Sequence, residues 1–254
     1  MADMFRLTPV SAFTDNYIWV LHDHRRAIAV DPGDAAPLQA WLAQQQLQLE
    51  AVWVTHHHAD HIGGLPALLA AWPGLAVYGP PDIPAVTHPC GHGSTVPAFG
   101  RAAQVLAIPG HTANHLAYYL APHLLCGDTL FGAGCGRVFD GTMTDLFHSL
   151  QSLAVLPADT LCYPAHEYTL SNLAFAAAVE PGNHAITARL QRDQATRAAN
   201  LPTLPTLLAD ELATNPFLRT TQAAVRHAAQ QHAGQEITHE EGIFATLRQW
   251  KNNF

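Results

Sequence analysis

The stretch THHHADHIGG crowds four histidines and one aspartate into a short segment that ends in two glycines. Neutral imidazole and carboxylate are ligands that suit zinc, iron and manganese. In an extended or turning segment, His56 and His58 point to the same side. Asp60 and His61 begin the next helix and point elsewhere. The H-x-H-x-D-H spacing therefore predicts ligands for two metal ions.

Three further His or Asp residues follow later apolar runs in the same way. His111 follows VLAIPG, Asp128 follows LLCG and His166 follows TLCYPA. In α/β sheets, ligand sites gather outside the carboxyl ends of the strands, so we expect these residues to join the first group. We predict that one ion binds His56, His58 and His111. A second ion would bind Asp60, His61 and His166. Asp128 would bridge the two ions.

Other polar residues lie close to these positions in the sequence. The chain has 17 histidines, and most of them must be surface or packing residues. His57 faces away from its neighbours, and His115 is expected to pack or to hydrogen-bond a ligand rather than to bind metal. Asp31 ends a strand, where it either orients a ligand histidine or forms the turn before proline.

Short apolar runs closed by Gly or Pro dominate the first two thirds of the chain and predict buried strands. They are AIAVDPG, AVWVTHHH, LAVYGP, VLAIPGH, HLAYYL and LLCGD. Helical stretches intervene at APLQAWLAQQQ, LPALLAAW and MTDLFHSLQSLAVL. Strands mixed with helices indicate an α/β fold.

The pattern changes after about Glu167. The segments TLSNLAFAAAVEP, HAITARLQRDQATRAAN, LPTLLADELATN and TQAAVRHAAQQHA have helical apolar spacing, with Pro and Gly at their ends. No further strand alternation is visible. We therefore predict a catalytic domain at residues 1–167 and a helical domain at residues 168–254.

Composition narrows the classes of function. The 254 residues are 48% hydrophobic and carry 12 basic against 20 acidic side chains, a net charge of −8. Such a charge disfavours nucleic acid as a partner. No apolar run reaches the ~18 to 20 residues of a membrane span, and the first residues lack the pattern of a signal peptide. None of the four cysteines forms a C-x-x-C pair, which favours free thiols in the cytoplasm. We expect a monomer without membrane contact.

The joint pattern of THHHADHIGG, PGHT, CGDTLF and AHEYT resembles the metallo-β-lactamase superfamily and, within it, the glyoxalase II (hydroxyacylglutathione hydrolase) family. The resemblance extends through GAGCGRVFDGT, AHEYTLSNLAFAAAVEPGN, NPFLR and LRQWKNNF, and so covers nearly the whole chain. It implies an α/β fold of the metallo-β-lactamase type, an αβ/βα four-layer sandwich with a C-terminal helical domain.

The resemblance also implies an activity, the hydrolysis of S-D-lactoylglutathione and related S-2-hydroxyacylglutathiones to glutathione and the hydroxy acid. The product from the first substrate is D-lactate, and the reaction is the second step of methylglyoxal detoxification. A hydroxide bridging two divalent metal ions would attack the thioester, with zinc favoured and iron or manganese as alternatives. Asp60 and Asp128 match catalytic positions of the family, and all seven predicted ligands match its metal site.

Binding of the glutathione part is implied at further positions. Four residues match the family's glutathione contacts, with Asn172 near them: Arg137, Tyr168, Arg248 and Lys251. One departure concerns Phe139, where some members carry tyrosine. Phenylalanine cannot donate a hydrogen bond, so one glutathione contact is missing or replaced there.

Two other functions share parts of this pattern. A persulfide dioxygenase has the same histidine-rich loop and binds a glutathione derivative, but it uses a single iron. A non-catalytic metal-binding module would hold its metal with every coordination position filled and would turn over no thioester. The availability of Asp60, His61 and His166 favours two ions over one. A secreted β-lactamase and a nuclease are disfavoured by the missing signal pattern and by the acidic charge.

Overall fold

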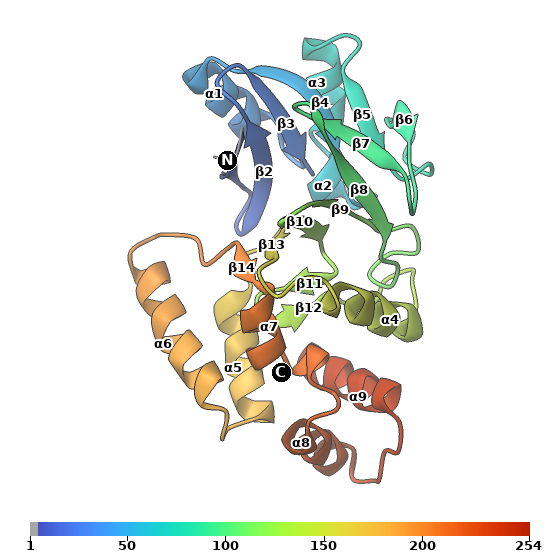
Figure 1. Cartoon of the computed structure of the whole chain (residues 1–254), viewed down its shortest axis with the longest axis vertical. Coiled ribbons are helices and arrows are strands. Elements are labelled where there is room, and N and C mark those ends of the chain that lie inside the picture. The colour runs from blue at the N-terminus through green and yellow to red at the C-terminus, as the bar shows by residue number, and fades with distance from the viewer. Residues whose placement is uncertain (1–4) are drawn as a thin grey trace. The chain divides into compact units, whose positions relative to one another are not determined.

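The computed structural model describes residues 5–254, which fold into two compact units. The first unit contains the chain up to Ala107 together with Asn114–Gly127, and the second contains Ile108–Ala113 together with Asp128–Phe254. The blue-to-green elements of Figure 1 belong mainly to the first unit and the yellow-to-red elements to the second.

A six-stranded mixed sheet forms the centre of the first unit, in the order β1-β2-β3-β4-β5-β6. Its strands span Arg6–Ala12, Asn16–His22, Arg26–Val30, Gln48–Trp53, Ala76–Gly79 and His88–Pro89. Strands β1 to β3 pair antiparallel, and β3 to β6 pair parallel. The central strands β2 to β4 are nearly continuous apolar runs, as expected of strands that are covered on both faces.

Helices cover one face of this sheet. They are α1 (Ala35–Gln45), the single turn α2 (Ala59–Ile62) and α3 (Leu65–Ala71). Leu38 and Leu42 of α1 and Leu65 and Leu68 of α3 are fully buried against the strands and form one hydrophobic core with them. Asp34 caps the N-terminus of α1, and its side chain accepts a hydrogen bond from the Ala36 backbone N–H.

Four more strands of the first unit form an antiparallel set, β7 to β10. They span Thr95–Ala98, Arg101–Ala107, Leu116–Leu120 and His123–Gly127. Tyr118 of β9 is fully buried, stacks on Trp53 of β4 and donates a hydrogen bond to the Val54 carbonyl. These contacts fix β9 against the end of β4, directly before the histidine-rich loop.

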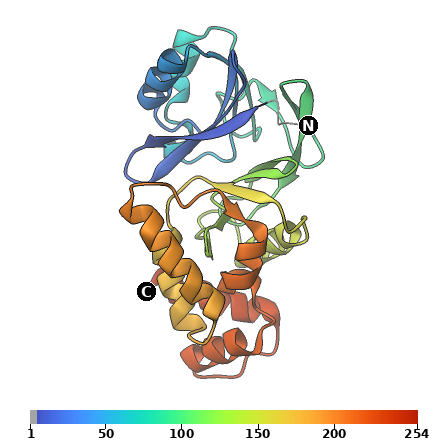
Figure 2. The same ribbon diagram turned by 60° about the vertical axis from the view of Figure 1, so that its left-hand side comes forward.

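The second unit combines short strands with helices. Its strands are β11 (Leu130–Phe131), β12 (Gly134–Cys135), β13 (Leu161–Pro164) and β14 (Thr206–Leu207). Strands β11 and β12 form a tight hairpin, and β13 pairs with β14. The α-helices are α4 (Met143–Ala154), α5 (Thr169–Val179), α6 (His184–Ala198), α7 (Leu208–Thr214), α8 (Ala223–Ala233) and α9 (Glu240–Asn252), and a 3-10 turn, η1, spans Pro216–Leu218. Figures 1 and 2 show α5 beside α6 and α8 beside α9.

A buried polar network ties the helices of the second unit together. The Arg189 guanidinium of α6 donates to the Glu211 carboxylate of α7 over 2.7 Å, and also to Thr206 and Thr214. Arg189 is 4% exposed and Glu211 is fully buried. Because each charge lies in a poorly solvated interior, either one alone would be strongly destabilising.

The structure contains every strand and helix that the apolar patterns predict. After residue 167 the structure contains one short strand, β14, that the apolar patterns did not predict. Two residues held in place by pairing with β13 are too few to leave an alternating pattern in the sequence. The compact units divide the chain in another way, since Ile108–Ala113 and residues 128–167 group with the later part of the chain. The domains at residues 1–167 and 168–254 stay a prediction. Within residues 5–254 no helix is long and apolar enough to cross a membrane, and the four cysteines form no disulfide.

Candidate metal centre

The end of β4 brings four of the predicted ligands together within the first unit. The His56 and His58 side chains lie side by side, with Nε2 of His56 3.0 Å from Nδ1 of His58. The chain then turns into α2, where the His61 ring lies 4.0 Å from the His56 ring, measured between centroids. Asp60 Oδ2 is 3.6 Å from His61 Nε2. One short loop and one helical turn therefore gather imidazole nitrogens and a carboxylate at one place.

A buried carboxylate orients two of these histidines. Asp31 Oδ2 lies 3.1 Å from His61 Nδ1 and accepts a hydrogen bond from the Thr55 hydroxyl over 2.7 Å. The Thr55 oxygen lies 3.0 Å from His56 Nδ1. Because the Thr55 hydroxyl donates its hydrogen bond to Asp31, its oxygen accepts a hydrogen bond from His56 Nδ1. His56 Nδ1 is then the donor, so that its Nε2 keeps its lone pair for a metal ion, and His61 Nδ1 faces the Asp31 carboxylate.

Thr55 and Asn16 carry roles that the sequence patterns did not reveal. Asn16 donates from Nδ2 to Asp60 Oδ2 over 3.0 Å and so fixes that carboxylate. Neither residue belongs to a ligand-type pattern, and Asn16 is far from Asp60 in the sequence. For Asp31, the contacts favour the orienting role over that of a simple turn residue.

The glycines around this loop permit close backbone contact. Gly63 and Gly64 have ordinary helical backbone angles, so the freedom to adopt unusual angles does not explain them. A Cβ on Gly64 would lie 2.4 Å from the Pro32 carbonyl oxygen, and a Cβ on Gly33 would lie 1.7 Å from that of Asp60. The Pro32–Gly33 turn is therefore pressed directly against the ligand loop.

Replacement of Gly33 by alanine should displace the backbone at Asp60. The obstructing atoms are backbone atoms and cannot rotate away, so we expect a loss of about 1–3 kcal/mol or more in unfolding free energy. Thermal unfolding and metal retention would both be measured. Gly91→Ala is the matched control, because a Cβ there meets nothing within 4 Å. Equal stability of the two variants would contradict the close approach.

The remaining three predicted ligands come together within the second unit. Asp128 follows Gly127 at the end of β10, and His166 follows β13. Asp128 Oδ2 lies 3.5 Å from His111 Nε2 and 3.4 Å from His166 Nε2. The His111 Nδ1 donates to the Arg137 carbonyl over 2.7 Å, which leaves the lone pair of Nε2 available to a metal ion. All three side chains are buried.

The spacing of these atoms fits a metal ion better than direct hydrogen bonds. Charge-assisted hydrogen bonds are about 2.7–2.9 Å long, whereas two ligands on one tetrahedral zinc ion are about 3.3 Å apart. The separations of 3.4–3.6 Å from each carboxylate to its histidines match the second value. Each unit thus presents His and Asp groups of the kind that bind a divalent metal.

The two other histidines near the motif have different surroundings. His57 Nδ1 lies 3.8 Å from Asp82 Oδ2 at the surface, directed toward that carboxylate. His115 is fully buried and stacks on the His56 ring, with centroids 4.6 Å apart and planes 20° apart. It packs against His56, one of the predicted ligands.

A cluster of positive charge lies in the second unit. Lys251, the only lysine of the chain, is half-buried and donates to the Ser171 carbonyl over 3.3 Å. Burial lowers the pKa of its ammonium group, and the positive charges of Arg248 and Arg137 lower that pKa further. Within the described residues, Arg248 and Lys251 have no carboxylate partner at ion-pair distance. The cluster therefore favours the binding of an anionic group.

The structure places Arg248 and Asn172 beneath the surface. Arg248 is 3% exposed, and its Nη1 donates to the Cys135 carbonyl over 2.7 Å, with the guanidinium over the Phe217 ring. Asn172 is also buried and donates to the Gly132 carbonyl. Both side chains are engaged with the β11–β12 hairpin.

Tyr168 and Phe139 lie beside predicted ligand histidines of the second unit. The Tyr168 ring stacks on the His166 ring, with centroids 4.8 Å apart and planes 7° apart. Phe139 is 64% exposed and meets the His111 ring edge-on, with centroids 5.2 Å apart. Its backbone N–H donates to the His111 carbonyl. A large apolar group so exposed beside a ligand is available to contact a substrate.

Comparison with known proteins agrees with this arrangement. Residues 13–166 match the metallo-β-lactamase superfamily profile, and residues 167–254 match the profile named hydroxyacylglutathione hydrolase C-terminus. A hydroxyacylglutathione hydrolase of Nitrosomonas eutropha is 48% identical, with 100% of both chains covered.

Solved structures share the fold. The BLEG-1 B3 metallo-β-lactamase matches with a TM-score of 0.62 at 23% identity, covering 85% of this chain and 99% of its own. TTHA1623 in a di-iron-bound form matches with a TM-score of 0.55 at 28% identity, covering 63% of this chain and 91% of its own. The predicted metallo-β-lactamase fold with a helical C-terminal region is confirmed. The chain belongs to the hydroxyacylglutathione hydrolase family of the metallo-β-lactamase superfamily.

Proposed function

We propose that this chain hydrolyses the thioester bond of S-D-lactoylglutathione and related S-2-hydroxyacylglutathiones, releasing glutathione and the hydroxy acid. Membership of the family supports the reaction class. The observation that carries the substrate assignment is the cluster of Arg137, Arg248 and Lys251, in which burial and then the charges of Arg248 and Arg137 lower the Lys251 pKa. Within residues 5–254, no carboxylate lies at ion-pair distance from Arg248 or Lys251. Glutathione brings two carboxylates, which would supply the missing negative charge.

We propose that the predicted ligands of the two units form one dinuclear centre. The first ion would take His56, His58 and His111, and the second would take Asp60, His61 and His166, with Asp128 between them. Support comes from the ligand-like spacing within each unit and from the di-iron form of TTHA1623. Zinc is the metal proposed, because His and carboxylate ligands suit it, with iron and manganese accepted by the same ligands. In this scheme residues 1–167 are catalytic and residues 168–254 bind glutathione.

When bound, the metal pair lowers the pKa of a water molecule toward neutrality and supplies positive charge for the oxyanion of the attacked carbonyl. The protein contributes the orientation of its ligands. Asp31 faces His61 Nδ1 directly and holds His56 through Thr55, so that His56 presents a lone pair at Nε2. The Arg137 carbonyl does the same for His111. Asp60 and Asp128 place anionic oxygens that fix the spacing of the site.

Departure of the thiol requires no dedicated proton donor. A thiol has an ordinary pKa of about 8.5, far below that of an alcohol, so the thiolate leaves readily. The side chains near the leaving group therefore serve to bind it. We propose that Lys251, Arg137 and the charge of Arg248 hold the glutathione carboxylates, and that the Tyr168 hydroxyl donates to the peptide. Phe139 would contact the substrate through its apolar ring, and Asn172 would support the site from beneath.

The enzyme would act on this small molecule as a cytoplasmic monomer, without nucleic acid or membrane. The net charge of −8 opposes phosphate binding. The reduced glutathione from which the substrate derives is kept in the cytosol.

The test compares S-D-lactoylglutathione with glutathione persulfide on the same metal-loaded protein. The proposal expects thiol release from the thioester without oxygen consumption. Oxygen-dependent turnover of the persulfide with no thioester hydrolysis would replace it with the dioxygenase function. Inertness toward both substrates would favour a metal-binding module.

Removal of Lys251 should weaken substrate binding without disturbing the metals. Its charge acts on a remote carboxylate, and such contacts are similar in the ground and transition states. We expect Lys251→Ala to raise KM up to about fivefold, with kcat little changed. Because the Lys251 pKa is lowered, its charge is lost at a lower pH than that of an ordinary lysine. The wild-type KM should therefore rise toward alkaline pH, and the KM of Lys251→Ala should not show this rise.

Two controls separate this effect from general loss of charge. Arg226→Ala removes one positive charge from α8 of the same unit and should leave KM unchanged. A small thioester without the peptide should be hydrolysed equally by wild type and Lys251→Ala. An unchanged KM for the glutathione thioester in Lys251→Ala would remove this residue from the binding site.

A further inference from the structure

The turn and second strand of the β11–β12 hairpin, residues 132–135, are held by side chains from later elements. Asn172 donates to the Gly132 carbonyl over 3.0 Å, and Asn215 donates to the Gly134 carbonyl over 2.9 Å. The Ala133 N–H donates to Glu211 over 2.8 Å. Arg248 donates to the Cys135 carbonyl. Every hairpin residue from 132 to 135 is therefore bound through its backbone to a helix or turn that lies much later in the sequence.

The continuation of this hairpin contacts the metal-ligand residues. Gly136 is packed so closely that a Cβ there would lie 2.0 Å from the Asp128 carbonyl oxygen and 3.1 Å from His111 Nδ1. The next residue, Arg137, offers its carbonyl to His111 Nδ1 over 2.7 Å. The position of the hairpin thus determines both the orientation of His111 and the packing against Asp128.

We propose that Asn215 and Glu211 are positioning residues, which hold the hairpin so that its backbone orients His111 and receives Arg248. This proposal rests on the proposed metal-dependent function. It gives the NPFLR segment, whose first residue is Asn215, a role in the active site that its position in the sequence does not suggest.

The burial of Asn215 and Glu211 and the backbone angle of Ala133 support a positioning role for this pair. Asn215 and Glu211 are both fully buried, and Asn215 Nδ2 also donates to Glu211 Oε2 over 2.9 Å. The other carboxylate oxygen of Glu211 is bound by Arg189. Ala133 has a positive φ of 53°, a conformation that a non-glycine residue keeps only when its surroundings hold it. The Glu211 carboxylate binds the N–H of that same residue.

Asn215 has two functions that a substitution can separate. Its Oδ1 accepts from the Phe217 N–H and caps η1, whereas its Nδ2 reaches the hairpin. Asn215→Ser keeps a good capping oxygen but lacks the Nδ2 donor. We expect zinc to be retained about tenfold less tightly against a chelator, the range typical for loss of a residue that orients a metal ligand. We also expect kcat to fall and KM for S-D-lactoylglutathione to rise.

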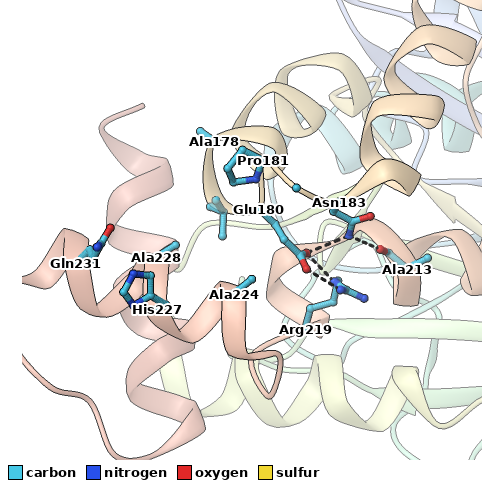
Figure 3. A pocket seen from close by; sticks show the side chains of 12 residues that line it. Ala178, Glu180, Pro181, Asn183, Ala213, Arg219, Ala224, His227, Ala228 and Gln231 are labelled. Atoms are coloured by element: carbon cyan, nitrogen blue, oxygen red, sulfur yellow. Dashed lines mark hydrogen bonds and ion pairs between the residues drawn. The ribbon is translucent and has the colours of Figure 1, made fainter.

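Asn183 provides a closely matched control. Its Oδ1 caps α6, and its Nδ2 donates to a backbone carbonyl, that of Ala213, and to a glutamate, Glu180. Figure 3 shows these two Nδ2 contacts beside a hollow of about 620 Å³. Asn183→Ser removes the same types of contact but touches no part of the hairpin. Zinc retention, kcat and KM should remain those of the wild type.

The outcomes distinguish the possibilities. If Asn215→Ser and Asn183→Ser lose stability but neither changes zinc retention or kinetics, Asn215 is only a cap and the proposal fails. If Asn215→Ser does not fold, Asn215→Thr keeps an uncharged capping oxygen and more of the side-chain volume while still lacking the Nδ2 donor, and the same comparison is made with Asn183→Thr. Zinc retention is measured without substrate. If wild type does not hydrolyse the thioester but Asn215→Ser still loses zinc, the positioning role stands and the proposed function fails.

Discussion

Replacement of Asp128 by alanine is expected to lower thioester hydrolysis by about a hundredfold or more, equivalent to ~2.7 kcal/mol of barrier. Its Oδ2 lies 3.5 Å from His111 Nε2 and 3.4 Å from His166 Nε2. Without this carboxylate the spacing of the ions changes, although the histidines remain. Activity should therefore fall further than metal content, and both are to be measured on one sample.

Asp159→Ala is the control for Asp128→Ala, because Asp159 is an exposed acidic residue in the same unit. It should retain full activity and full metal content. Turnover of Asp128→Ala within about tenfold of wild type, ~1.4 kcal/mol, would show that Asp128 does not bridge the ions.

Replacement of Arg189 by alanine should destabilise the second unit by about 3–5 kcal/mol. The substitution leaves the carboxylate of Glu211 buried with its charge uncompensated, and it removes hydrogen bonds to Thr206 and Thr214. Chemical denaturation, followed by a probe in the helices, measures the loss. At a temperature where part of the Arg189→Ala protein remains folded, that folded fraction should still bind zinc through the first unit.

Arg192→Ala is the matched control for Arg189→Ala. Arg192 lies on the same helix and pairs with Asp193 and Asp210, but its side chain is 55% exposed. Exposed pairs contribute about 0–1 kcal/mol, so this variant should be nearly as stable as the wild type. Similar losses in the two variants would show that burial does not decide the strength of the Arg189 interaction.

Local patterns were sufficient to predict which histidines and aspartates gather within each unit. The contacts of His56, His58 and His61 depend on one strand end and one turn, so residue spacing carries most of the geometry. Fold class followed from the same kind of signal, because buried strands and amphipathic helices leave periodic patterns. The resemblance to a known family supplied the substrate, which spacing alone could not indicate.

Long-range contacts left no such signal. Glu211 binds Ala133, and Asn215 binds Gly134, across large separations in sequence. No pattern near either residue predicts its partner. The burial of Arg248 also could not be anticipated, since its helical spacing is that of an exposed helix end, whereas its guanidinium reaches the hairpin carbonyls.

The glycines show where a sequence signal has more than one physical cause. Glycine often marks unusual backbone angles, but Gly63 and Gly64 have helical angles and their role is close contact with the neighbouring backbone, including the Pro32–Gly33 turn. The compact units show a similar difference. Contacts of Ile108–Ala113 with later residues, rather than a change in composition, decide where that segment belongs.

The most direct test of a dinuclear thioester hydrolase is a zinc titration of the metal-free protein, with bound metal and S-D-lactoylglutathione hydrolysis measured on the same samples. We predict that hydrolysis rises to a plateau at two bound ions per chain and is abolished by a chelator. Full activity with one ion per chain would contradict the dinuclear site, and two bound ions without hydrolysis would contradict the proposed function.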